Sequence, residues 1–215
     1  MRVDIWSDVV CPWCYVGKAR FERALDGFPH RDQVEVVYHS FELDPDAVDT
    51  GETNIQMLSK KFRMPIAQAW EAEERVAGLA RAEGLEYQPE RPVGNTFDLH
   101  RVLHLGRDKG VQGDLVSGIY QAHFAQNRPI FDAGVITTVA TKAGLDPADV
   151  RQVLDSDDYA DAVRADEAQA RTLGISGVPF YVFDMALGVS GAQSVETFGT
   201  ALTKGWERGQ GNTSS

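Results

Sequence analysis

Cys11-Pro12-Trp13-Cys14 is the most informative stretch of this sequence. It follows Val3-Asp4-Ile5-Trp6, an alternating run that predicts a β-strand, and it precedes Tyr15 to Leu25, where apolar residues recur with helical spacing. The chain has 215 residues and only two cysteines, which both lie in this stretch. Two cysteines three positions apart, between a strand and a helix, are typical of a redox-active dithiol.

The positions of the two cysteines predict different roles. Cys11 falls at the expected N-cap, and Pro12 at the first helical position, where its missing N–H leaves no donor unsatisfied. The free backbone N–H groups and the positive end of the helix dipole should face the Cys11 sulfur and favour the thiolate, which is the nucleophile in disulfide exchange. Cys14 lies one turn later, close enough to attack a mixed disulfide at Cys11. We therefore expect Cys11 to attack and Cys14 to resolve.

Three other interpretations of the pair are weaker. A structural disulfide would gain little, because the ring that it closes is short. A zinc site needs four ligands, and His30 and His39 do not have the spacing from the cysteines that zinc fingers use. Two buried, unreactive cysteines are the remaining alternative. We favour the redox interpretation and expect neither a metal ion nor a bound cofactor.

The composition predicts a folded chain without a nucleic-acid or membrane partner. A hydrophobic content of 43% is ample for a core, and a net charge of −11 opposes binding to nucleic acid or an anionic membrane. The start Met1-Arg2-Val3-Asp4 leaves no room for a signal peptide before the dithiol, and no apolar run approaches about 18 residues. We therefore expect a cytoplasmic protein, in which a lone C-x-x-C pair is more often catalytic than structural.

A long helical segment interrupts a β-rich chain. Residues 2–7 and 34–41 predict strands on either side of the first helix, a β-α-β unit whose strands pair in parallel. Strands return at 180–183 and 187–190, before a last helix capped by Ser194. Between them, helices are expected over about 55–62, 65–84, 96–108, 113–126, 132–143, 147–154 and 159–173. We predict an α/β fold with three parts: residues 1–45 with 174–208 as one domain, an all-helical insertion over 46–173, and a disordered tail over 209–215.

Pro179 is expected to complete the site. It precedes a strand, and proline is also common at the first residue of a strand or on an edge strand without any role in a site. The alternative is a cis bond between Val178 and Pro179, with the proline packed against the dithiol and the Val178 backbone free to pair with an extended substrate. The upstream C-x-x-C on a β-α-β unit favours this second interpretation.

These features together resemble the DsbA-like thioredoxin superfamily. The resemblance rests on Cys-Pro-Trp-Cys, on Gly177-Val178-Pro179-Phe180 and on the helical insertion, and it covers residues 2–206. More narrowly, the chain looks like the FrnE-like branch, through Phe41 to Pro45, Asn95 to Arg101 and Ser190 to Gln193. The resemblance implies a thioredoxin-like fold and cytoplasmic thiol–disulfide oxidoreductase or disulfide isomerase activity on protein or low-molecular-weight thiols and disulfides. Some FrnE-like proteins have a second cysteine pair, which this chain lacks.

A sister group leaves a second function open. The chain is also similar to 2-hydroxychromene-2-carboxylate isomerase, a glutathione-using enzyme in which a serine typically stands at the position of Cys11. Both cysteines are present here, which favours redox chemistry over an isomerase or transferase that activates a glutathione-like thiol. A non-enzymatic binder is the third possibility. The sequence makes no prediction of the physiological substrate, the direction of exchange or the oligomeric state.

The expected substrate contacts are Pro12, Trp13, Val178 and Pro179. Ser7 and Asp8 precede the dithiol and are candidates to line it. Asn95, Asp98, His100 and Arg101 are candidates to face a cleft between the two domains, although helical geometry does not allow all of them to point inward together. Caps and interhelical hydrogen bonds are the plainer interpretation of these four residues, and a structural role is expected for His39.

Overall fold

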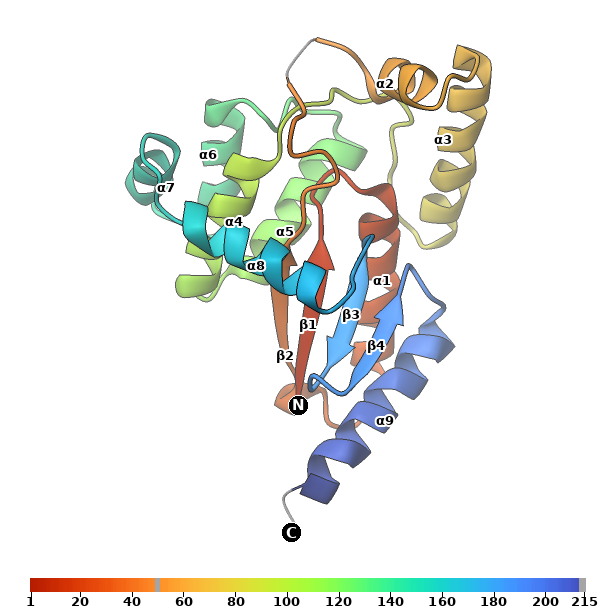
Figure 1. Ribbon diagram of the computed structural model, residues 1–215, viewed down its shortest axis with the longest axis vertical. Helices are drawn as coiled ribbons and strands as arrows, with labels where there is room; N and C mark the ends of the chain where they lie inside the picture. The colour runs from red at the N-terminus through yellow and green to blue at the C-terminus, as the bar shows by residue number, and fades with distance from the viewer. Residues whose placement is uncertain (49–50, 213–215) are drawn as a thin grey trace.

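The protein is described by a computed structural model for residues 1–48 and 51–212 (Figure 1). Among these residues, the strands form a mixed sheet in the order β2-β1-β3-β4. The central strand β1 pairs in parallel with β2 and antiparallel with β3, and β4 pairs antiparallel with β3. The strands span β1 (Arg2–Ser7), β2 (Glu35–Ser40), β3 (Phe180–Phe183) and β4 (Leu187–Ser190).

Helices lie between β1 and β2, between β2 and β3, and after β4. Between the first two strands lies α1 (Pro12–Asp26), followed by a short 3₁₀ turn, η1 (Arg31–Gln33). After β4 comes α9 (Val195–Asn212). The insertion lies between β2 and β3. It contains α2 (Asn54–Lys61), α3 (Ile66–Ala82), α4 (Phe97–Asp108), α5 (Gln112–Tyr120), a π-helical segment η2 (Gln121–Ala125), α6 (Ala133–Lys142), α7 (Pro147–Leu154) and α8 (Ala160–Thr172).

One face of the sheet is apolar and packs against α1 and α9. Alternate residues of β1 and β3 point to this face, because side chains alternate along a strand. Ile5 is opposite Tyr181, and both are buried in the main core. Phe21 of α1 contacts Tyr181 and Phe198, with ring centroids 5.4 and 5.7 Å away. A short loop over residues 8–11 leads from the end of β1 to the start of α1, so that α1 begins at the same end of the sheet where β1 ends (Figure 1).

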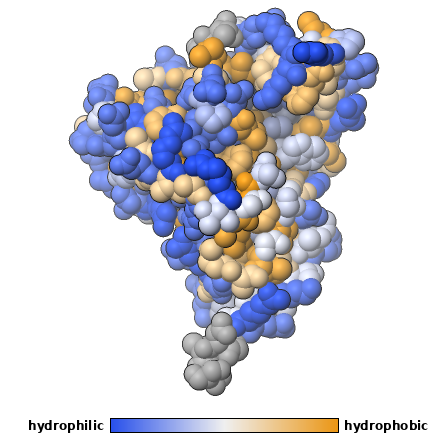
Figure 2. Space-filling model, viewed as in Figure 1, coloured by the Kyte–Doolittle hydropathy of each residue, from blue (hydrophilic) through white to orange (hydrophobic). Residues whose placement is uncertain are grey.

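The opposite face is mixed in polarity and is covered in part by α8. Trp6 and Val182 pack there against Ala170. Figure 2 shows hydrophilic side chains over α7 and α8 and apolar ones over the strands that α8 leaves uncovered. No helix in the described part of the chain is long and apolar enough to cross a membrane.

The α/β thioredoxin-like fold with a helical insertion is confirmed. The helix expected over 113–126 begins at Gln112 and changes to π-helical geometry after Tyr120. Residues 209–212 were expected in a disordered tail, which is wrong, because α9 continues to Asn212. Each further residue adds a backbone hydrogen bond to an existing helix, and Arg208 ties this end of α9 to the Ala186 carbonyl at 3.0 Å. Residues 213–215 of the expected tail lie outside the described residues.

Candidate functional site

The dithiol lies at the first turn of α1, as expected. Cys11 is the N-cap, with extended backbone angles, and Pro12 is the first helical residue. The Cys11 carbonyl accepts hydrogen bonds from the N–H groups of Cys14 (3.0 Å) and Tyr15 (3.2 Å), which closes the first turn. The Cys11 side chain makes no capping hydrogen bond, so its sulfur accepts none from the backbone N–H groups of the first helical turn.

Both cysteines are free of a disulfide and buried, with 3% of Cys11 and 2% of Cys14 exposed. Burial raises the pKa of the Cys14 thiol well above its ordinary value, and the neighbouring Cys11 sulfur raises it further. Cys14 is therefore held in its protonated form at neutral pH, as a resolving thiol is before the first exchange step.

The loop before β3 brings the second half of the site to Cys11. The Val178–Pro179 bond is cis, as the sequence analysis expected, and Pro179 is buried. The Val178 carbonyl oxygen lies 3.6 Å from the Cys11 sulfur. The Pro179 carbonyl accepts from the Gly191 N–H at 2.8 Å, which anchors the loop to the end of β4. Cys11 and Val178 thus meet as expected, although 167 positions separate them, and Pro179 follows Val178 across the cis bond.

The expected substrate contacts differ in exposure. Trp13 is 42% exposed, and Leu43, from the loop after β2, is 44% exposed. Pro12 and Val178 are only partly exposed. The surface beside the dithiol is therefore apolar in part, and the role of these residues in substrate binding stays a prediction.

Asp8 and His100 form a contact that sequence reasoning did not predict. The Asp8 carboxylate accepts from the Leu43 N–H at 2.8 Å and faces His100 Nε2 at 3.3 Å, and both side chains are 1% exposed. The Asp8 carbonyl oxygen accepts from the Cys11 N–H at 3.2 Å. Asp8 and His100 were candidates taken separately, and nothing in the sequence analysis joined them.

The other polar residues near the start of α4 serve the fold. Arg101 donates from Nη1 to the Ser156 carbonyl at 2.6 Å and the Asp158 carbonyl at 3.1 Å, which ties α4 to the loop before α8. Asn95 donates to the Pro45 carbonyl at 2.9 Å. Asp98 is exposed and binds Arg101. Of these four residues, only His100 faces the dithiol loop.

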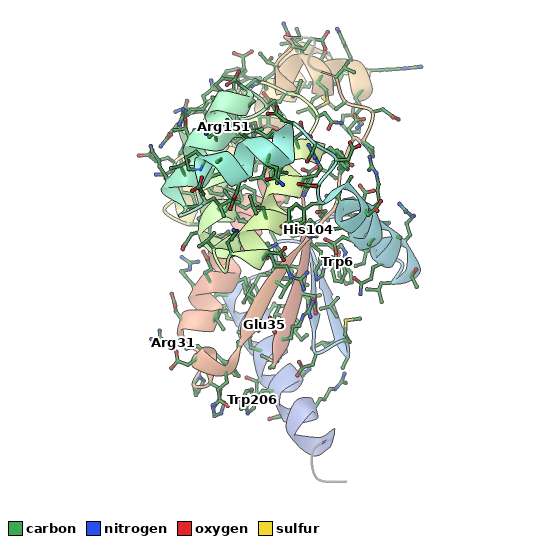
Figure 3. The ribbon with its side chains drawn as sticks, turned by 90° about the vertical axis from the view of Figure 1, so that its left-hand side faces the viewer. Trp6, Arg31, Glu35, His104, Arg151 and Trp206 are labelled. Atoms are coloured by element: carbon green, nitrogen blue, oxygen red, sulfur yellow. The ribbon has the colours of Figure 1, made fainter. Side chains whose placement is uncertain are left out.

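A second buried polar cluster lies on the other face of the sheet. His39 bonds to Asp166 through Nδ1 and to Asp4 through Nε2, both at 2.7 Å, while His104 Nε2 lies 3.1 Å from Asp166. Trp6 stacks on His39, with centroids 4.5 Å apart. In Figure 3, Trp6 and His104 lie where the strands meet the helices. The cluster joins β1 and β2 to α4 and α8, and His39 has the structural role that the sequence analysis expected.

A groove of about 680 Å³ runs along another side of α1. Tyr15, Lys18 and Glu22 line it on α1, and residues of α5, η2 and α6 line the opposite wall. Neither cysteine borders the groove. The groove is therefore separate from the dithiol.

The sequence of residues 2–203 matches the family model described as the DSBA-like thioredoxin domain. The chain belongs to this family. It is similar to a probable DsbA oxidoreductase from Streptomyces coelicolor, with 50% identity and a TM-score of 0.91 over 96% of this chain and 90% of the other.

More distant structures share the fold. A 2-hydroxychromene-2-carboxylate isomerase has a TM-score of 0.70 and 13% identity over 100% of both chains. The cytosolic disulfide reductase DsbM from Pseudomonas aeruginosa, in a structure with GSH, has a TM-score of 0.66 and 14% identity over 96% of this chain and 100% of that one. At these identities the similarity shows the fold alone.

Proposed function

We propose that this protein is a thiol–disulfide oxidoreductase whose Cys11 and Cys14 exchange with protein or low-molecular-weight disulfides. The observation that supports it most strongly is the placement of the Cys11 sulfur at the open end of α1, 3.6 Å from the Val178 carbonyl oxygen, with Cys14 one turn behind it. The family and the relative named as a probable DsbA oxidoreductase support the same class of reaction.

The exchange proceeds in two displacements. The Cys11 thiolate attacks one sulfur of the substrate disulfide, the substrate S–S bond breaks, and the other substrate sulfur leaves as a thiolate that takes up a proton. Cys14 then loses its proton and attacks Cys11, so that the second substrate sulfur leaves. The products are a Cys11–Cys14 disulfide and a substrate reduced by two electrons. The same steps in reverse oxidise a dithiol substrate.

The surroundings of Cys11 favour an extended, partly apolar substrate segment. Trp13 and Leu43 offer apolar surface beside the dithiol. The Val178 backbone is the proposed partner for hydrogen bonds of the strand-addition type. We propose a cytoplasmic setting, in line with the FrnE-like resemblance and with a similar fold named as a cytosolic disulfide reductase.

A trapping experiment tests the proposal. Reduced Cys14→Ser protein is mixed with insulin or with oxidised glutathione, and intact-mass spectrometry follows the products. We expect a stable mixed disulfide at Cys11, because the variant lacks the thiol that would release the substrate. Cys11→Ser is the matched control and should form no adduct and lose insulin reduction. Adducts on Cys14 in the control, or full activity of Cys11→Ser, would refute the assignment.

A second measurement, with wild-type protein and reduced glutathione, separates the competing function. An isomerase or transferase that activates a glutathione-like thiol would bind that thiol without exchanging disulfides. Wild-type protein that binds reduced glutathione tightly but never forms an internal disulfide would favour this alternative, whose fold the chain shares.

A further inference from the structure

The turn that follows β4 holds the loop that carries Val178 and Pro179. This turn, residues 190–193, starts at the last residue of β4, and the Gly191 N–H donates to the Pro179 carbonyl at 2.8 Å. Gly191 has a φ of +82°, which glycine adopts without strain. The Gln193 N–H in turn donates to the Gly191 carbonyl at 2.9 Å. The position of the 190–193 turn therefore helps to fix the position of the loop.

Arg20 joins this turn to two other parts of the molecule. It lies on α1, and its Nη1 donates to the Ala192 carbonyl at 2.8 Å, while its Nε donates to Glu83 at 2.6 Å. Glu83 is the C-cap of α3, in the inserted helices. Helix α1 also packs closely on the turn, since a Cβ built at Gly17 would lie 3.4 Å from the Ala192 Cα. One side chain thus links the dithiol helix, the insertion and the 190–193 turn.

Arg23 makes the ion pair without the contact to the turn. It binds the other carboxylate oxygen of Glu83, and its side chain makes no other hydrogen bond among the described residues. The Arg23 side chain is 53% exposed, against 18% for Arg20. An exposed ion pair stabilises a fold only slightly. Arg20 is mostly buried and uses two donors of its planar guanidinium at once, which fixes the group in one orientation.

We propose that Arg20 is a positioning residue for substrate binding at the dithiol. It holds the 190–193 turn, and the turn holds the loop on which an extended substrate would pair. The inference rests on the proposed function, in which the Val178 backbone is the pairing partner. Because the Val178 carbonyl oxygen lies 3.6 Å from Cys11 Sγ, a substrate on this loop is presented to the attacking sulfur. Arg20 makes no hydrogen bond to either cysteine, so it acts on substrate binding and not on the sulfur chemistry.

Two disulfides separate substrate binding from sulfur chemistry. One is a linear apolar peptide whose single cysteine is disulfide-bonded to cysteamine. The other is cystamine, which has the same small leaving group and no peptide backbone. Reduced full-length protein is mixed with an excess of each, and alkylation followed by mass spectrometry times the formation of the Cys11–Cys14 disulfide. The dependence on substrate concentration gives a limiting rate and a half-saturating concentration.

Arg20→Leu should raise the half-saturating peptide concentration about tenfold, the scale of losing one or two backbone hydrogen bonds, and should change the limiting rate less than about twofold. The rate with cystamine should also change less than about twofold, because cystamine has no backbone to pair. Arg23→Leu is the matched control, since it removes an arginine from the same Glu83 and leaves the Ala192 contact in place. Both substrates should react with this control as they do with the wild type.

Gly191→Ala disturbs the same turn without removing Arg20, because alanine adopts a positive φ only with strain. It should likewise raise the half-saturating peptide concentration and spare the cystamine reaction, and it decides the question if Arg20→Leu does not fold.

The outcomes for the inference and for the proposed function are distinct. Folded Arg20→Leu or Gly191→Ala protein that binds the peptide like the wild type, or that loses the peptide and cystamine reactions equally, overturns the inference and leaves the oxidoreductase intact. A wild type that shows no preference for the peptide over cystamine does the same. A wild type that forms no Cys11–Cys14 disulfide with either substrate overturns the proposed function and the inference with it.

Discussion

Single residues explain how closely α1 approaches the Pro179 loop. Gly17 is the contact point: a Cβ built there would lie 2.7 Å from the Tyr181 hydroxyl oxygen and 3.1 Å from Pro179 Cγ. Only glycine allows this approach. The sequence predicted the dithiol from its local spacing, and it predicted the cis bond from the combination of Val178-Pro179 with that upstream dithiol. It did not predict the Asp8–His100 contact, because 92 positions separate the two residues and no local spacing encodes the pairing.

Gly17→Ala should destabilise the protein by about 1–3 kcal/mol, because the added methyl group must push Tyr181 or Pro179 aside. Gly78 in α3 is the matched control, since a Cβ there meets nothing within 4 Å. Gly78→Ala should stabilise by about 0.5–1 kcal/mol, because it removes chain entropy from the unfolded state. Urea unfolding of both variants measures the difference. Equal effects would contradict the close approach at Gly17.

At the scale of elements, the sequence predicted where strands and helices occur and failed where tertiary contacts change their ends. The strand expected over 34–41 spans Glu35–Ser40, and the short strands β3 and β4 lie where expected. The last helix runs longer than its composition indicated, because Arg208 holds it to the β3–β4 turn. The sequence also gave no sign that β1 and β2 would bury a polar cluster beneath α8. Asp4 and His39 lie in predicted strands, and the bonds of His39 to Asp4 and Asp166 depend on contacts between remote residues.

The His39 cluster should make the docking of α8 depend on pH. Burial alone would lower the pKa of His39, but its hydrogen bonds to the carboxylates of Asp166 and Asp4 outweigh burial and raise the pKa above 6.5. The resulting stabilisation is present below pH 6.5 and is lost as the pH rises through the raised value. For Asp166, hydrogen bonds with His104 and His39 overcome burial and lower the pKa below 3.8, so its contribution is lost only in acid.

The unfolding free energy should therefore fall between pH 6 and pH 9, by on the order of 1 kcal/mol more in the wild type than in His39→Gln. Chemical denaturation at each pH, followed by tryptophan fluorescence and circular dichroism, measures this difference. His30→Gln is the control, because His30 stacks on Trp206 and has no carboxylate partner among the described residues. Parallel pH profiles for the wild type and His39→Gln would show that the cluster does not bind a proton more tightly in the folded state.

At the scale of the whole molecule, the fold brings distant segments to one dithiol. The main core runs continuously from the sheet into the inserted helices, with Val3 and Ile5 in the same cluster as Leu115 and Val153. The division into residues 1–45 with 174–208 and an insertion over 46–173 remains a prediction. The order of strands and helices was readable from hydrophobic periodicity, which repeats along the chain. The packing of the insertion against the dithiol loop depends on contacts between remote residues, and periodicity does not encode them.

A redox titration of Cys11 and Cys14 tests the account most directly. The protein is equilibrated in buffers of defined thiol–disulfide ratio, quenched with an alkylating reagent and analysed by mass spectrometry. We predict that both thiols disappear together in one reversible two-electron transition, within the range of about −120 to −270 mV covered by dithiol oxidoreductases, and that peptide mapping finds a Cys11–Cys14 disulfide. Two cysteines that stay free at every potential, or that form adducts without ever joining each other, would contradict the account.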